Sequence, residues 1–108
     1  MTRMIIVYTT CKNSKEAKKI GNQLLKKHLA ACYNVLSQME SASLWPPHSE
    51  KIETNTEAVL LIKTLSNRFE DVEIEILKLH SYKMPCIFAL PVLALNKKYF
   101  EWLEGEVT

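Results

Sequence analysis

The sequence contains little glycine and almost no net charge, and each feature excludes a class of function. Its only glycines are Gly21 and Gly105, so the chain cannot form the glycine-rich loops that cradle nucleotide phosphates. Lysine and arginine number 14 and the acidic residues number 12, which leaves a net charge of +2. This small charge indicates neither a nucleic-acid partner nor a membrane-surface partner, because both favour a strongly basic patch.

Cysteine is scarce, and the sequence has no long apolar run. The cysteines Cys11, Cys32 and Cys86 show no paired spacing, which argues against a disulfide scaffold and favours a reducing compartment. No stretch approaches the roughly 18 apolar residues of a membrane span, and the apolar run at residues 4–8 is too short for a secretion signal. We therefore expect a cytoplasmic protein that does not enter a membrane.

The remaining composition is typical of a single globular domain. The chain has 108 residues, of which 47% are hydrophobic and 24% are charged. A chain of this size buries roughly 65% of its unfolded surface, which is enough for one hydrophobic core. We expect residues 1–108 to form one domain.

The pattern of apolar residues predicts four strands and three helices. Strands are expected at residues 4–10, 32–45, 51–64 and 86–93. Helices are expected to begin at Asn13, Ser66 and Asn96, where a polar side chain precedes apolar residues spaced three and four apart. The order β-α-β-β-α-β is that of an α+β, ferredoxin-like sandwich, here with an extra C-terminal helix.

The predicted strands carry apolar residues on both faces. In the last strand, Phe88 and Leu90 alternate with Ile87 and Ala89. Two helices cover only one face of such a sheet, and the other face is normally polar at every second position. A monomer would expose a large apolar patch, so we expect a homo-oligomer. The alternative is that the C-terminal helix covers the second face.

A set of short segments spread over nearly the whole chain has a distinctive order and spacing. They are LAACYNV at 29–35, Trp45, LLIKT at 60–64, LHSY at 79–82, Pro85, IFALPV at 87–92, Asn96, Tyr99 and WL at 102–103. Together they resemble the CutA family of divalent-cation tolerance proteins. The chain departs from the family pattern at Cys86, which replaces a glutamate, and in the hairpin after Trp45, which is longer and lacks a glycine.

The resemblance implies a cytoplasmic homotrimer with an architecture related to the PII signalling proteins. It implies a role in the response to metal ions, with copper binding in some members, and no defined enzymatic activity. It also implies a cleft between subunits. The family's cleft positions fall on Cys32, Trp45, Lys63, His80, Tyr82 and Cys86.

Three of these cleft residues are candidate ligands for copper or another divalent cation. His80, Cys86 and Cys32 would supply an imidazole and two thiolates, which are donors that copper(I) and zinc accept. The sequence has no CxxC or HExxH spacing to support a metal site. The alternatives are that Cys32 and Cys86 are buried apolar residues, that His80 only ends a helix, and that Cys11 is a plain loop cysteine.

Two other functions stay open at this stage. A Cys–His enzyme would need Cys32 or Cys86 within hydrogen-bonding reach of His80, although no catalytic motif supports this and no catalytic residue is predicted. A trimeric interaction or signalling scaffold would instead use the hairpin tip at residues 44–52 to contact another protein.

Overall fold

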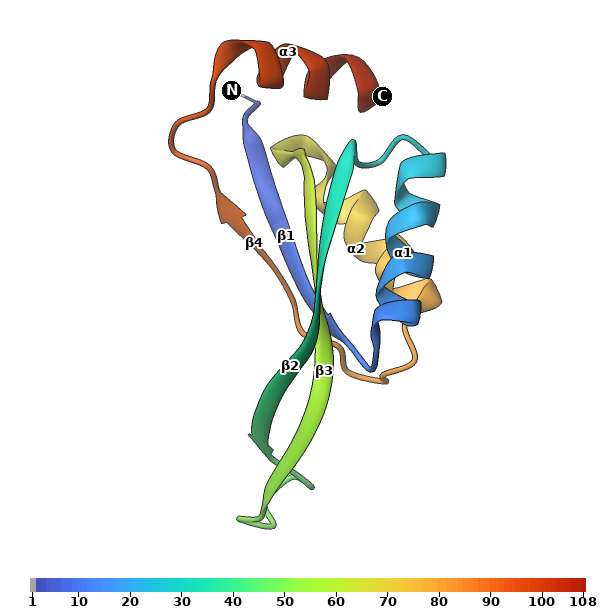
Figure 1. Ribbon diagram of the computed structural model, residues 1–108, viewed down its shortest axis with the longest axis vertical. Coiled ribbons are helices and arrows are strands. Elements are labelled where there is room, and N and C mark those ends of the chain that lie inside the picture. Colours follow the sequence, from blue (N-terminus) through green and yellow to red (C-terminus); the bar gives the residue numbers. More distant parts are fainter. Residues whose placement is uncertain (1) are drawn as a thin grey trace.

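The computed structural model describes residues 2–108 and contains one antiparallel sheet with helices on one face (Figure 1). The elements are β1 (Met4–Cys11), α1 (Ser14–Lys26), β2 (Cys32–Leu44), β3 (Ile52–Leu65), a 3-10 turn (Ser66–Arg68), α2 (Phe69–Leu79), β4 (Ile87–Pro91) and α3 (Lys97–Glu106). The strand order is β2-β3-β1-β4, so the predicted ferredoxin-like α+β fold is confirmed. None of the helices within residues 2–108 is long and apolar enough to cross a membrane.

The hydrophobic core lies between the sheet and the two helices α1 and α2. Ile20 and Leu24 of α1 and Ile76 of α2 are fully buried against Val7 of β1 and Ile62 of β3. Burying an aliphatic side chain of this size stabilises the fold by about 1.5–3 kcal/mol relative to leaving it exposed. The three-and-four spacing of apolar residues in both helices therefore fixes which sheet face they cover.

The helix starts agree with the sequence in one case and differ in two. The side chain of Asn13 caps α1 by accepting a hydrogen bond from the Glu16 N–H at 2.9 Å, as predicted. Ser66 does not cap α2, because it lies in the 3-10 turn and its Oγ accepts from the Arg3 N–H at 3.1 Å. Asn96 flanks α3 but makes no capping hydrogen bond.

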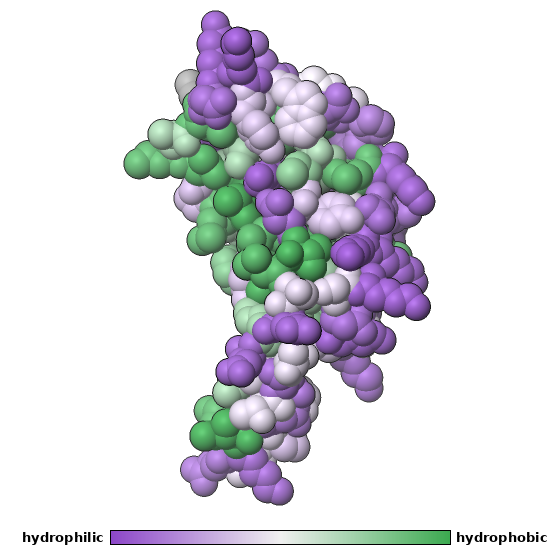
Figure 2. All heavy atoms as spheres, viewed as in Figure 1, coloured by the Kyte–Doolittle hydropathy of each residue, from purple (hydrophilic) through white to green (hydrophobic). Residues whose placement is uncertain are grey.

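The second face of the sheet is apolar and largely uncovered, as the alternating pattern predicted. Tyr8 of β1 stacks on Phe88 of β4 with ring centroids 4.5 Å apart. Phe88 and Leu90 remain 40% and 50% exposed, and Figure 2 shows apolar side chains at the surface on the β4 side of the molecule. Within one chain, α3 covers only the end of this face at Met4 and Leu65 and leaves Phe88 and Leu90 exposed.

Helix α3 packs across one end of the sheet. Its Leu103 is fully buried and clusters with Met4 of β1 and Leu65 of β3. The preceding strand β4 is shorter than predicted, because regular pairing with β1 runs only from Ile87 to Pro91. The segment 92–96 then leaves the sheet to reach α3.

Strands β2 and β3 continue past the sheet as a free two-stranded ribbon. Pairing of β3 with β1 ends at Ala58, whereas residues 39–44 and 52–57 pair only with each other. A bulge between Leu36 and Met39, where Gln38 has a positive φ of 59°, marks the start of the ribbon. The ribbon gives the chain extents of 47 × 26 × 23 Å, and a ribbon without a third strand is marginally stable alone.

Candidate functional site

The predicted cleft positions occupy three separate places in one chain. Cys32 and Lys63 are paired across β2 and β3, level with Ile6 of β1. His80 and Tyr82 lie in the turn after α2, where His80 contacts Thr10. These two levels are four residue steps apart along β1, which is about 13 Å along the sheet.

Of the other two cleft positions, Trp45 lies apart from both groups, whereas Cys86 is level with Thr10 and the His80 turn, because the next residue, Ile87, pairs with Thr9. Trp45 is at the end of the ribbon and is 41% exposed. Cys86 precedes β4 and is exposed, so the interpretation of Cys86 as a buried apolar residue is wrong. One chain therefore does not assemble the six positions into a single cleft.

The Cys32 end of the sheet combines a thiol, an ammonium group and a phenol. Cys32 is half-buried, and the Lys63 Nζ lies 5.7 Å from the centre of the Tyr99 ring, within cation–π range. Burial and a hydrogen bond with the Cys32 thiol raise the pKa of Tyr99. The interaction places α3 in contact with the first residues of β2.

His80 is held in one orientation because both of its ring nitrogens are engaged. The Tyr82 backbone N–H donates to Nδ1 at 3.1 Å, and Nε2 lies 2.8 Å from the Thr10 carbonyl oxygen. Since Nδ1 accepts, Nε2 must carry the proton that it donates to Thr10. The imidazole therefore joins the turn at 80–85 to the end of β1.

Glu16 joins the same turn to the start of α1. Its Oε1 accepts from the Lys12 N–H at 3.0 Å, and its Oε2 accepts from the Ser81 N–H at 2.9 Å. Burial opposes ionisation, but hydrogen bonds from Ser81 and Lys12 outweigh it and hold the pKa of the Glu16 carboxyl below its usual value. Glu16 is thus a charged carboxylate in an almost fully buried position.

Cys11 completes a group of three metal-type donors with Glu16 and His80. Its thiol sulfur, a Glu16 carboxylate oxygen and a His80 ring nitrogen all lie within 4.8 Å of one another. Cys11 ends β1 and is fully buried, so its interpretation as a plain loop cysteine is wrong. Burial and the nearby carboxylates of Glu16 and Glu57 raise the pKa of the Cys11 thiol to about 12.

Tyr82 and Glu57 extend this network to the base of the ribbon. The Tyr82 hydroxyl donates to Glu57 Oε2, and the Ser41 hydroxyl donates to Glu57 Oε1, both at 2.6 Å. Burial and the Glu57 carboxylate raise the pKa of Tyr82. The turn after α2 is therefore hydrogen-bonded to β1, α1 and β3, and Glu57 links it to Ser41 of β2.

The sequence indicated one member of the donor group and missed two. Neither Cys32 nor Cys86 belongs to a group of three such donors in residues 2–108, whereas Cys11, Glu16 and His80 do. No local pattern predicts the contact of Cys11 with His80, which lies 69 residues further along the chain.

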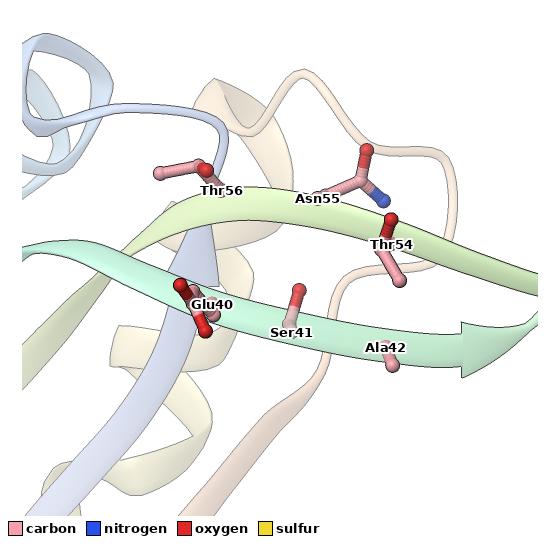
Figure 3. Close-up of a pocket in the computed structure, with 6 residues that line it drawn as sticks. All are labelled: Glu40, Ser41, Ala42, Thr54, Asn55 and Thr56. Carbon is pink, nitrogen blue, oxygen red and sulfur yellow. The ribbon is translucent and has the colours of Figure 1, made fainter.

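Two open, polar hollows lie beside the ribbon. One has a volume of about 460 Å³ and is lined by Glu40, Ser41, Ala42, Thr54, Asn55 and Thr56 (Figure 3). The other, about 540 Å³, is lined by Lys12, Asn13, Ser14, Lys15, Ser37, Gln38, Thr56 and Glu57. Neither is lined by a cysteine or histidine, so neither offers the donors expected for copper.

The sequence and structural relatives of the chain carry one family name. The family model of the CutA1 divalent ion tolerance protein matches residues 5–106. The divalent-cation tolerance protein CutA of Archaeoglobus fulgidus is 37% identical over 101 residues, covering 94% of this chain and 95% of the relative. The chloroplastic protein CutA of Arabidopsis thaliana is 34% identical, and the match spans about half of its length (54%).

Solved structures show the same fold over almost the entire chain. The divalent ion tolerance protein CutA1 from Ehrlichia chaffeensis superposes with a TM-score of 0.92 at 28% identity, covering 100% of this chain and 98% of the other. A structure described as the periplasmic divalent cation tolerance protein CutA from Archaeoglobus fulgidus gives 0.91 at 35% identity, covering 97% and 99%. The chain therefore belongs to the CutA1 divalent ion tolerance protein family.

Proposed function

We propose that the chain acts in the response to divalent metal ions as a cytoplasmic homotrimer that binds copper at a cleft between its copies. The observation that carries this proposal is the separation of the cleft positions. Cys32, Trp45 and His80 come from three different places of one chain. They line a single cleft only when different copies contribute them.

The uncovered sheet face supports assembly. Leu36, Phe88 and Leu90 are 57%, 40% and 50% exposed on two strands of a sheet whose other face is packed by helices. Such a patch on a monomer would favour association. The trimeric, PII-like arrangement is what the family resemblance suggests, and the free ribbon would gain the neighbouring strands that it lacks.

The donor chemistry fits copper at the thiols and less readily at the imidazole. Cys32 and Cys86 are not buried, and copper(I) prefers thiolate donors. Both ring nitrogens of His80 already make hydrogen bonds, so His80 would have to release one of them to join. The residues that would hold copper are thus Cys32 and Cys86, with His80 as the third ligand.

Light scattering of the purified protein tests the assembly. We expect a mass of about three times the 12.5 kDa of one chain, and a monomer at all concentrations would refute the proposed cleft. Copper(I) titration tests the ligands: Cys32→Ser, Cys86→Ser and His80→Ala should each weaken binding. His48→Ala, at an exposed position in the hairpin loop, is the matched control and should bind like wild type. Equal binding by all five proteins would exclude this ligand set.

The ribbon tip supports a second candidate, an interaction scaffold without a direct metal role. Leu44 and Ile52 are each 72% exposed and flank Trp45 at the tip. Exposed apolar residues at the end of a projecting hairpin suit contact with another protein. Two results together would favour this candidate over the first. All of the copper-ligand variants would bind copper as wild type does, and the double variant Leu44→Ser/Ile52→Ser would lose a protein partner that wild type binds.

A Cys–His enzyme is the least supported function. Cys32 and His80 are about 13 Å apart along the sheet, and His80 Nε2 carries a proton that it already donates to Thr10. The imidazole is therefore not available to take a proton from the Cys32 thiol of the same chain. We propose no catalysis.

A further inference from the structure

The ribbon, formed by residues 39–44 and 52–57, has few contacts with the rest of the chain (Figure 1). Its two strands pair with each other, and β1 pairs with β3 only as far as Ala58. Neither hydrophobic cluster found in residues 2–108 includes a ribbon residue. Core packing therefore does not fix the direction in which the ribbon leaves the sheet.

The base of the ribbon has the geometry of a pivot. Strand β2 has a bulge between Leu36 and Met39, and Gln38 within it has a φ of 59°. A bulge leaves a residue unpaired and bends its strand, and a positive φ is uncommon for a residue such as glutamine. Regular pairing is thus interrupted at the level where the support of β1 ends.

One side-chain contact joins the ribbon to the rest of the chain across this pivot. The Tyr82 hydroxyl donates to Glu57 Oε2 at 2.6 Å, and Glu57 Oε1 accepts from the Ser41 hydroxyl of β2 at 2.6 Å. Both distances are those of hydroxyl–carboxylate hydrogen bonds, which are about twice as strong as neutral ones. Within residues 2–108, no other side-chain hydrogen bond or ion pair connects the ribbon to another element.

We propose that Glu57 and Tyr82 form a latch that sets the direction of the ribbon, with the bulge at Gln38 as its pivot. While the hydrogen bond is made, the tip residues Leu44 and Trp45 are held in one place relative to the sheet. When the hydroxyl leaves the carboxylate, the ribbon swings as a unit, because the pairing between its own strands stays intact. The tip lies about 20 Å beyond the bulge, so a swing of about 15° moves it by about 5 Å.

The turn that carries the Tyr82 hydroxyl is itself held firmly. The Tyr82 backbone N–H donates to His80, and the Ser81 N–H donates to Glu16 of α1. The freedom to move therefore belongs to the ribbon and not to the turn. The latch acts within one chain and goes beyond the proposed function, because it depends neither on copper nor on the number of copies.

Amide hydrogen exchange of the purified protein tests the latch. Tyr82→Phe removes only the hydroxyl, so amides of residues 39–44 and 52–57 should exchange about fivefold faster than in wild type, with exchange in β1 unchanged. The matched control is Tyr33→Phe, which removes a hydroxyl that donates to Asn22 away from the ribbon and should leave ribbon exchange unchanged. Wild-type exchange in the ribbon of Tyr82→Phe would overturn the proposal. Equal acceleration in β1 and the ribbon would also overturn it, because Tyr82 would then support the whole fold.

The fluorescence of Trp45 provides a second measurement at the tip. The chain has two tryptophans, Trp45 and Trp102, so Trp102→Phe leaves the tip residue as the only tryptophan. In this background, time-resolved anisotropy should show a larger amplitude of nanosecond motion when Tyr82→Phe is added, and no change when Tyr33→Phe is added. Unchanged motion of Trp45 without the Tyr82 hydroxyl would show that other contacts hold the ribbon, and the latch would be refuted.

Discussion

The two faces of the sheet differ in how far the chain itself covers them. Toward α1 and α2, Ile62 is fully buried, and its packing is completed by the same chain. Toward the other face, Leu90 is half exposed and has no covering helix. Both are aliphatic residues of a four-stranded sheet, so residue type alone does not say which face the chain covers by itself.

This difference distinguishes residues that stabilise the single chain from residues that would stabilise an assembly of copies. Residues on the helix-covered side stabilise each chain whatever its concentration. Residues on the open side would gain burial only from another copy, so in the proposed assembly their contribution would depend on protein concentration. Matched substitutions on the two sides therefore distinguish a fold that is complete in one chain from one that depends on assembly.

The largest expected contrast is between Ile62→Ala and Leu90→Ala. Ile62→Ala leaves a cavity in the core and should lower the free energy of unfolding by about 2–5 kcal/mol at every protein concentration. Leu90→Ala should cost less than about 1 kcal/mol in dilute protein and more in concentrated protein. Urea unfolding at two concentrations measures both, and a concentration-independent Leu90→Ala effect would contradict the comparison.

The two glycines give the next contrast. A Cβ on Gly21 of α1 would lie 2.6 Å from the Tyr33 ring, so Gly21→Ala should destabilise the fold by about 1–3 kcal/mol through overpacking. A Cβ on Gly105 of α3 meets nothing within 4 Å. Gly105→Ala should therefore be neutral or stabilise by up to about 1 kcal/mol. Thermal melting of both variants checks the signs, and equal shifts would contradict the packing described for α1.

The buried and exposed thiols should differ in alkaline solution. The pKa of the Cys11 thiol rises from 9.0 to about 12 on folding, so the stability that it confers is complete below pH 9 and falls between pH 9 and 12. The slope is about 1.4 kcal/mol per pH unit. Urea unfolding of wild type should thus weaken with pH more steeply than that of Cys11→Ser, whereas Cys86→Ser should follow wild type. Parallel curves for all three proteins would show that Cys11 is not buried as described.

The smallest contrast concerns two ion pairs. Lys27 of α1 binds Glu75 of α2 at 2.7 Å, and the Glu75 side chain is only 6% exposed. Lys27→Met should cost about 1 kcal/mol, because it leaves a desolvated carboxylate without its cation. Lys97→Met breaks the 3.7 Å pair with Glu101 on α3, where both side chains are well exposed, and should cost about 0–0.5 kcal/mol. Double-mutant cycles measure both values; a larger coupling for the α3 pair would reverse the expected order.

Local signals in the sequence predicted most of the fold. The cap at Asn13 depends on a residue three positions away, and the strands follow from alternation within each segment. The predicted cap at Ser66 failed because its hydroxyl bonds to Arg3, 63 residues earlier. The predicted length of β4, residues 86–93, was wrong because the chain turns away from the sheet edge after Pro91 to reach α3.

The candidate sites depend on contacts that no local pattern encodes. His80 was selected through the family resemblance, yet the donor groups beside it in the chain are Cys11 and Glu16. The sequence indicated Cys11 only as a loop cysteine and gave no indication of Glu16. Their proximity arises because β3 is antiparallel to β1 and α2 then runs back along the sheet in the direction of β1, which brings the end of α2 beside the end of β1. Such a cluster becomes visible only after the topology is known.

The projecting ribbon affects how a single chain would move through solvent. The radius of gyration is 14.9 Å, compared with about 13 Å for a compact domain of this length. A long, narrow particle meets more frictional drag than a sphere of equal mass, so one chain would leave a gel-filtration column earlier than its mass indicates. If the ribbon lies against neighbouring copies, the assembled protein is rounder, and its elution position becomes a measure of how closely the ribbon is held.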